Sequence, residues 1–286
     1  MRRVALLAAG AAIAVLSACA ATGRAEPPAA ADHQDAATRA SAFLSSGYVP
    51  RGSGPDSLLI NPPPPAPGSP AEARDMAAAD AAVAIQGSLR FEQAAIDADL
   101  FSPSTTGIFS CAAGFVISPE TTPRIAALMR RTAADLALSV YPTKRKYQRP
   151  RPFMVNGKPT CTPQDEAMLR QDGSYPSGHA AIGVGWGLIL ASIVPDRAGQ
   201  LAARGRAFAD SHFELPRVTA GNRRVCNVHW LSDTEEGAVV AAAMVARLHA
   251  EPAFRADLDA ARAEVEALRT SLPKPDCTKE QAALGG

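Results

Sequence analysis

Four consecutive residues, Pro176-Ser177-Gly178-His179, combine the start of a helix with a side chain that can transfer protons. Serine is a favoured N-cap residue, and the apolar run Ala180–Ala191 that follows is long enough for a buried helix. The free N–H groups of a first helical turn attract anions, and Gly178 has no Cβ that would keep a ligand away from them. His179 would lie beside such an anion. Capped helix starts are common, so the motif gains meaning only from the residues around it.

A cluster of cations precedes this motif, between Lys144 and Arg151. Its five basic residues within eight positions repel one another unless an anion or an acidic surface compensates them. Pro150 and Pro152 stiffen the chain around Arg149 and Arg151, and a guanidinium group matches the geometry of phosphate oxygens. The cluster is therefore a candidate anion site, with a solvated basic patch as the alternative.

Further along the chain, His229 and Asp233 are four residues apart, a spacing that places two side chains on one face of a helix. A carboxylate beside an imidazole fixes its tautomer and stabilises its protonated form. Two simpler interpretations stay open, namely an ion pair on a helix surface and a metal site. Metal binding is disfavoured if the basic residues converge here, because they would repel a cation.

Together the three segments resemble the three-part signature of the phosphatidic-acid-phosphatase type 2 superfamily, which includes the vanadium haloperoxidases. Within it, the chain is most similar to the bacterial class A non-specific acid phosphatases, over about residues 45 to 250. Asn222 departs from the serine that this family usually has there, and we expect it to tune the site without abolishing it. The matching residues are Lys144, Arg151, Pro152, Pro176, Ser177, Gly178, His179, Arg223, His229 and Asp233.

The resemblance implies an enzyme that hydrolyses small phosphate monoesters through a phosphohistidine, with an acidic pH optimum and no cofactor or metal. His229 would be the nucleophile, Asp233 would orient it, and His179 would act as general acid and base. The phosphate-binding residues would be Lys144, Arg151, Ser177, Gly178 and Arg223. The remaining cations are expected at the rim or as structural partners, namely Arg145, Lys146, Arg149 and Arg224.

Three other functions fit parts of this pattern. A vanadium-dependent haloperoxidase could use the same anion site, because vanadate resembles the pentacovalent phosphoryl state. A membrane lipid phosphatase would need several spanning helices, and only the N-terminal segment approaches one. A non-catalytic phosphate-binding envelope lipoprotein would bind phosphate without turnover, and would not require His179 or the His229–Asp233 pair.

The chain has 286 residues, 47% of them hydrophobic, which is enough for one sizeable core. Its formal net charge of +1 gives no long-range attraction to nucleic acid. We expect an N-terminal tether and proline-rich segment over residues 26–70, one folded domain over 71–275 and a C-terminal tail over 276–286. The oligomeric state stays open, a homo-oligomer included.

Residues 1–25 are expected to be an export signal, because two arginines precede an apolar run. Leu16-Ser17-Ala18-Cys19 is similar to a bacterial lipoprotein box, which would place a lipid anchor for the outer membrane on Cys19. Cleavage after Ala25 is the alternative, and either would place the mature protein in the periplasm. In that oxidising compartment four cysteines are expected to form two disulfides of open pairing, namely Cys111, Cys161, Cys226 and Cys277.

The elements that position these residues are all expected to be helices. Residues 153–175 contain several Pro and Gly breakers and predict a loop, and no run of alternating β-branched residues indicates a strand. We therefore predict an all-α, single-domain helical bundle of the acid phosphatase/vanadium haloperoxidase type. Helices are predicted from Ala71, over Leu89–Leu100, from Ser118 to about Val140, over Asp196–Phe213, from about Asn227 to His249, and from Pro252.

Overall fold

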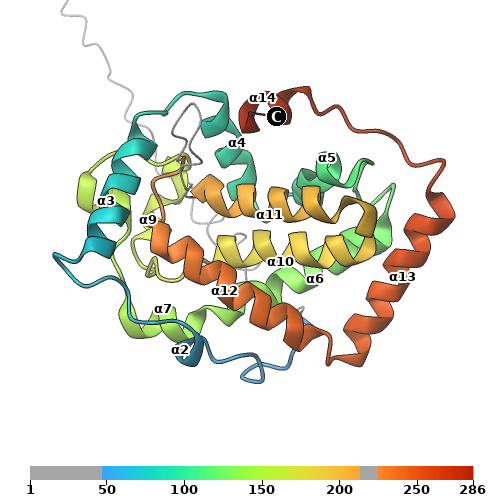
Figure 1. Cartoon of the computed structure of the whole chain (residues 1–286), viewed down its shortest axis with the longest axis horizontal. Helices are drawn as coiled ribbons and strands as arrows, with labels where there is room; N and C mark the ends of the chain where they lie inside the picture. Colours follow the sequence, from blue (N-terminus) through green and yellow to red (C-terminus); the bar gives the residue numbers. More distant parts are fainter. Residues whose placement is uncertain (1–46, 213–224, 286) are drawn as a thin grey trace, which may run out of the picture. The chain divides into compact units, whose positions relative to one another are not determined.

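The computed structural model describes residues 47–212 and 225–285, and every regular element within these ranges is helical (Figure 1). Because all of these elements are helices, the predicted all-α fold is confirmed. All of them fall within one compact unit. Within the described ranges, no helix is both long and apolar enough to cross a membrane. The elements are α2 (Ser57–Ile60), α3 (Pro70–Val83), α4 (Leu89–Ala98), η1 (Pro103–Phe109), α5 (Ser110–Ala113), α6 (Pro123–Ser139), α7 (Tyr141–Tyr147), α8 (Pro152–Asn156), η2 (Pro163–Asp165), α9 (Glu166–Leu169), α10 (Gly178–Ile193), η3 (Pro195–Arg197), α11 (Ala198–His212), α12 (Leu231–Leu248), α13 (Pro252–Leu268) and α14 (Thr278–Leu284).

Helix α10 begins where the sequence predicts and packs against α6, α11 and α12 (Figure 1). Its N-cap residue Ser177 accepts the N–H of Ala180 at 3.1 Å through the side-chain oxygen. Two glycines bring α10 and α11 into backbone contact. A Cβ on Gly187 would lie 2.8 Å from the carbonyl oxygen of Leu201, and one on Gly205 would lie 2.6 Å from that of Gly183. Larger residues would separate the two helices and move the N-terminus of α10.

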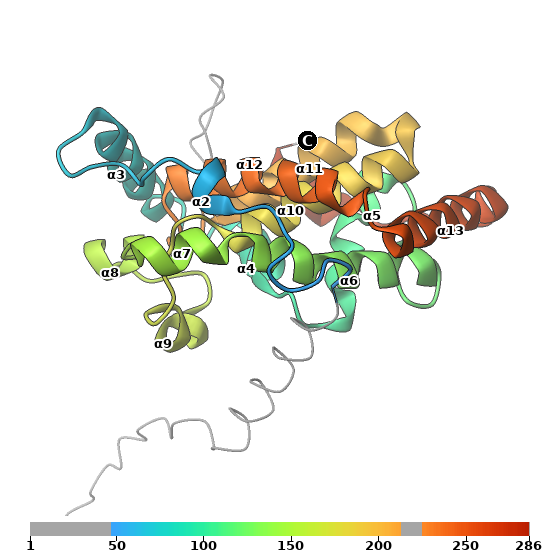
Figure 2. The same ribbon diagram turned by 90° about the horizontal axis from the view of Figure 1, so that it is seen from below.

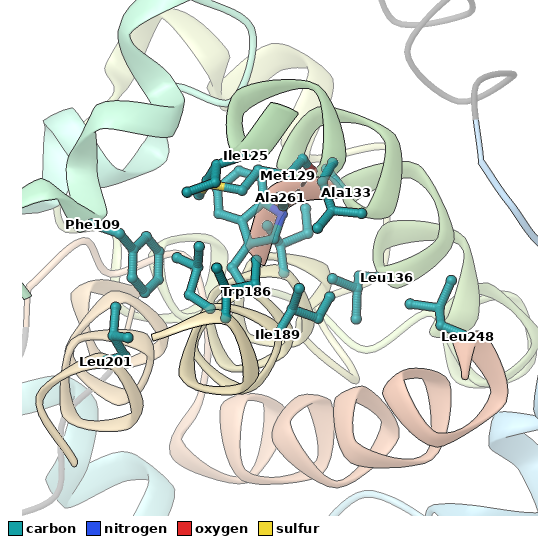
Figure 3. Packing of buried hydrophobic residues seen from close by; sticks show 14 of the residues in the cluster. Phe109, Ile125, Met129, Ala133, Leu136, Trp186, Ile189, Leu201, Leu248 and Ala261 are labelled. Carbon is teal, nitrogen blue, oxygen red and sulfur yellow. Dashed lines mark hydrogen bonds between the residues drawn. The ribbon is translucent and has the colours of Figure 1, made fainter. Parts of the chain in front are cut away.

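Buried side chains of α6, α10 and the neighbouring helices form the main core (Figure 3). Trp186 is 1% exposed, and its indole N–H donates to the carbonyl oxygen of Met129 at 2.8 Å. The ring is therefore buried with its polar group paired. Phe109 meets the Trp186 ring edge-on, with the ring centroids 6.2 Å apart. Burying one large apolar side chain stabilises a fold by about 1.5–3 kcal/mol, so this packing fixes α6 against α10.

Helix α6 begins one turn later than the sequence predicts. The Ser118 side chain accepts the N–H groups of Glu120 and Thr121, at 3.2 and 3.1 Å, and so closes a turn instead of a helix. Thr122 and Pro123 then repeat the same start signal, and the helix begins at Pro123. The predicted start was wrong because two equivalent signals follow each other and the first is used by a turn.

The chain before α3 packs against the helices from residue 47 onward, within the span expected to be an N-terminal tether and proline-rich segment (residues 26–70). Tyr48 is 8% exposed, its N–H donates to the Asp135 carboxylate at 2.8 Å, and its hydroxyl donates to Asp257 at 2.7 Å. Helix α2 packs against α7 and α12 (Figure 2). These contacts join residues far apart in sequence, and local patterns therefore do not predict them.

The described part of the expected C-terminal tail, residues 276–286, is likewise attached to this unit. Cys277 forms a disulfide with Cys111. The Glu280 carboxylate accepts from the guanidinium of Arg204 at 3.2 Å, and Arg204 itself is only 3% exposed. A covalent bond and a largely buried ion pair therefore hold this segment, and α14 packs against α4.

Candidate active site

A cavity of about 570 Å³ brings together residues from all three predicted motifs. Its lining comes from the end of α4 and the segment after it, from α6, α7, η2 and α9, from the first turns of α10, and from the segments before α8, α10 and α12. The predicted site residues that line it are Lys144, Arg151, Gly178, His179 and His229.

Two buried cations share one carboxylate in this cavity. Lys144, in α7, is 4% exposed, and Arg151, which precedes α8, is 2% exposed. Oδ2 of Asp172 accepts from Nζ of Lys144 at 3.0 Å and from Nη2 of Arg151 at 3.2 Å. Lys144 also donates to the carbonyl oxygen of Gly173, and Nε of Arg151 donates to that of Leu169 at 2.9 Å. Sequence reasoning missed Asp172, because a single acid in a loop carries no spacing signal.

Burial and proximity make this part of the cavity strongly attractive to anions. Burial, together with the charge of Arg151, lowers the pKa of Lys144 to about 8. Burial also lowers the pKa of Arg151 from its usual high value. Two buried cations gain from any further negative charge, since their own hydration has been lost. The Lys144 and Arg151 side chains can therefore bind a phosphoryl group directly.

His229 lies between a carboxylate and a guanidinium. Its Nδ1 is 3.3 Å from Oδ2 of Asp233, and its Nε2 is 3.3 Å from Nη1 of Arg151. Because a guanidinium only donates, Nε2 must be the accepting nitrogen, and we assign the proton of the neutral ring to Nδ1. Burial, Arg151 and Lys144 all hold the pKa of His229 well below its usual value. The ring is therefore neutral, with its lone pair on Nε2.

The His229–Asp233 pair forms differently from the prediction that both residues lie on one helix face. Helix α12 begins at Leu231, so His229 precedes the helix and Asp233 lies in its first turn. Oδ2 of Asp233 also accepts the backbone N–H of Trp230 at 2.8 Å, which caps the helix. The spacing of four residues still brings the two side chains together, because the chain bends back at the cap.

Asp233 is tied to the first motif by Arg149, which is neither exposed nor at the rim. Nη1 of Arg149 donates to Oδ1 of Asp233 at 2.8 Å, and Nη2 donates to Asp75 at 2.7 Å. Asp75 in α3 and Asp233 are both 0% exposed. Burial raises the pKa of Asp233, and the Arg149 charge opposes this rise. Sequence reasoning allowed Arg149 a structural role but missed Asp75, one of three acids in the alanine-rich helix α3 that no motif sets apart.

The central motif is joined to the third one by the backbone. The N–H of Ser177 donates to the carbonyl oxygen of Asp233 at 2.8 Å. Gly237 of α12 permits this approach, because a Cβ there would lie 2.4 Å from the Ser177 carbonyl oxygen. Gly178 lines the cavity, and a Cβ on it would meet only Val140, at 3.6 Å. Packing within the protein therefore does not require glycine at position 178.

His179 is anchored by the end of α4. Its Nε2 lies 3.1 Å from the carbonyl oxygen of Ala98, and because a carbonyl only accepts, Nε2 carries a proton. Burial, with the nearby charges of Arg151 and Lys144, lowers the pKa of His179 to about 4. His179 and His229 line the same cavity, and His179 also contributes to the low pKa of His229.

Several predicted residues lie outside the described ranges. They are Arg223, Asn222 and Arg224 of the third motif, and Cys19 with the whole of residues 1–25. Their assigned roles therefore stay predictions. Among the described residues, no group of three or more His, Cys, Asp and Glu side chains is arranged to hold a metal ion.

The structure pairs the four remaining cysteines as Cys111–Cys277 and Cys161–Cys226. Cys226 of the second disulfide lies three residues before His229, so this bond joins the third motif to the segment between α8 and η2. In the same place, the N–H of Cys161 donates to the carbonyl oxygen of Cys226 at 3.3 Å. The cross-link therefore limits the movement of two cavity walls relative to each other.

The chain matches known proteins over more than the three motifs. Residues 126–255 match the PAP2 superfamily. The chain is 37% identical over 231 residues to the acid phosphatase of Zymomonas mobilis, which covers 80% of this chain and 83% of that protein. It is 38% identical over 228 residues to a non-specific acid phosphatase of Salmonella typhimurium, with 78% and 86% covered. A non-specific acid phosphatase of Providencia stuartii is 35% identical over 223 residues, again with 78% and 86% covered.

Proposed function

The chain belongs to the PAP2 superfamily, and we propose that it is an acid phosphatase that hydrolyses small phosphate monoesters through a phosphohistidine on His229. The observation that supports this most is the state of His229. The ring is held neutral, its Nε2 lone pair lies beside a buried guanidinium, and it lines the same cavity as His179. The names of the relatives support the same reaction class.

In the first step, the Nε2 lone pair of His229 attacks phosphorus, and the bond from phosphorus to the ester oxygen breaks. The ester oxygen leaves with the bonding electron pair and takes a proton from His179, which releases the alcohol. Lys144, Arg151 and, as a prediction, Arg223 neutralise the charge on the equatorial oxygens. Asp233 stabilises the positive charge that develops on the imidazole ring of His229.

In the second step, water replaces the alcohol. His179, now neutral, takes a proton from that water while the water oxygen attacks phosphorus and the phosphorus–nitrogen bond breaks. The electron pair returns to Nε2 of His229, and inorganic phosphate is released. Both histidines end in their starting states, so the cycle balances without an oxidant or reductant.

The expected acidic optimum follows from the two histidines. His179 must carry a proton to act as the acid, and its pKa of about 4 in the free enzyme restricts that state to acid solution. Binding of a phosphate anion raises this pKa, because it offsets the charges of Lys144 and Arg151. Burial and the charges of Arg151 and Lys144 lower the pKa of His229 well below its usual value, which favours the neutral ring that the nucleophile requires.

The reaction as written needs no cofactor, since Lys144 and Arg151 supply the positive charge that the transition state requires. We therefore expect activity to persist after dialysis against a chelator. A loss of turnover that added divalent metal restores would contradict this part of the proposal.

Export and membrane attachment are also part of the proposal. They rest on the predicted signal over residues 1–25 and on Cys19, and the two disulfides are typical of an oxidising compartment such as the periplasm. Cys19→Ser should abolish lipid labelling and release the protein from membranes into the soluble periplasmic fraction. Size-exclusion chromatography with light scattering would determine the oligomeric state, which the sequence leaves open.

The test of the nucleophile is His229→Ala, assayed with nitrophenyl phosphate. We expect essentially no turnover, and no phosphohistidine by mass spectrometry after an alkaline quench. His249→Ala is the matched control, because His249 is exposed at the end of α12 and contacts Phe254 instead of the cavity. Near-normal turnover of His229→Ala would show that the nucleophile is another residue.

A further inference from the structure

Asp172 is the only acid among the described residues that contacts both Lys144 and Arg151, the two cations assigned to the phosphate. One oxygen of its carboxylate accepts from both, at 3.0 and 3.2 Å. Neither the sequence motifs nor the reaction steps above give this residue a role. A carboxylate at this place must affect how strongly the same cations bind another anion.

The two cations and the Asp172 carboxylate are held by different contacts. Lys144 and Arg151 are almost fully buried, and backbone carbonyl oxygens of Leu169, Asp172 and Gly173 hold them independently of any acidic side chain. The Asp172 side chain is 36% exposed, lies in the loop between α9 and α10, and lines the cavity. Rotation of this side chain toward solvent would therefore leave the two cations in place.

We propose that Asp172 acts as an internal competitor of phosphate, releasing Lys144 and Arg151 to an incoming monoester and reclaiming them as inorganic phosphate leaves. This proposal rests on the proposed phosphatase function. A phosphoryl group and a carboxylate repel each other when they contact the same two cations. The exchange therefore weakens the binding of the product and prevents the site from being blocked by it.

The alternative is that Asp172 is a permanent counter-ion, which keeps the two cations charged and in position. The two roles predict opposite changes when the charge is removed. A competitor, once neutral, yields the cations more easily, and phosphate binds more tightly. A counter-ion, once neutral, leaves two buried cations uncompensated, and phosphate binding becomes weaker or the protein unfolds.

The experiment measures inhibition by inorganic phosphate of nitrophenyl phosphate hydrolysis, for the full-length wild type and for Asp172→Asn. We expect the inhibition constant to fall about tenfold, the scale of one charge-assisted hydrogen bond that need no longer be broken. If release of phosphate limits the rate, kcat of Asp172→Asn should fall as well, because the product leaves more slowly. Asp165→Asn is the matched control, since Asp165 lines the same cavity and contacts neither cation, and its inhibition constant should stay within about twofold.

An unchanged or higher inhibition constant in Asp172→Asn would overturn the proposal. The inhibition constant of Asp172→Ala for inorganic phosphate provides a second measurement. If neither variant folds, Asp172 is an obligatory counter-ion, and the proposal is refuted as well. Calorimetric titration with inorganic phosphate gives the same comparison without turnover. If wild type hydrolyses the ester and His229→Ala does not, the phosphatase function stands whatever Asp172 does.

Discussion

Replacing Arg149 by methionine removes the only side-chain charge, among the described residues, that pairs with both Asp75 and Asp233. Arg149 lies 2.7 and 2.8 Å from these two carboxylates, which are 0% exposed. Breaking a buried ion pair by removing one partner costs about 3–5 kcal/mol, because the other charge stays buried and uncompensated. Here the two acids keep backbone donors at Ser232 and Trp230, so we expect the lower end, about 3 kcal/mol.

For a domain of roughly 150–250 residues, about 3 kcal/mol corresponds to a fall in melting temperature of about 6–12 °C. Calorimetry on Arg149→Met measures this fall in melting temperature directly, and urea unfolding measures the loss of unfolding free energy. Arg145→Met is the control, because Arg145 belongs to the same basic segment and is exposed. Among the described residues its guanidinium contacts only the Tyr141 ring, with Cζ 5.9 Å from the ring centroid. Its effect should stay within about 0.5 kcal/mol.

The same variant should change the pH dependence of turnover. The Arg149 charge holds down the pKa of Asp233, so its loss lets Asp233 take up a proton at higher pH. A protonated Asp233 no longer stabilises the positive charge on His229, and the acidic limb of kcat should therefore move to higher pH. A melting temperature within about 2 °C of wild type, with an unmoved acidic limb, would refute the assignment of Arg149 as the shared partner of the two acids.

Two further predictions concern the anion site. Gly178→Ala should fold with near-normal stability, because the added Cβ would meet only Val140, at 3.6 Å. Its kcat/KM for nitrophenyl phosphate should nevertheless fall at least about tenfold, because the methyl group obstructs the backbone that faces the phosphate. Normal kinetics in this variant would mean that phosphate does not approach that backbone. The KM should rise above about pH 8, because Lys144 then loses the charge that binds phosphate, whereas an unperturbed lysine would stay charged to about pH 10. A KM that is constant to pH 10 would contradict a role for Lys144 in binding.

The sequence predicts best where the signal is local. Ser177 caps α10 as expected, because a cap depends on one side chain and the three residues after it. The start of α6 is mispredicted because two start signals follow each other, and the Ser118 side chain closes a turn before the second signal opens the helix. The packing of Tyr48 depends on acids far along the chain, and no local pattern indicates it.

The residues of the site likewise divide into those that local motifs predict and those that only the fold brings together. Lys144, Arg151, Gly178, His179 and His229 belong to spaced motifs, and the structure places them around one cavity. The acids that balance the cations, such as Asp75 and Asp172, belong to no sequence motif and acquire their partners only when the helices pack. Two disulfides are predicted from the count of cysteines, whereas the pairing needs the fold, because four cysteines allow three arrangements.

Asp233 is the residue at which all three segments meet. Its carboxylate accepts from Arg149, from the backbone of Trp230 and from His229, and its carbonyl oxygen accepts from Ser177. Loss of this junction would therefore dismantle the catalytic geometry and loosen the scaffold in the same event. Thermal inactivation should then follow the unfolding curve of the whole domain, with no inactive yet fully folded form accumulating before it.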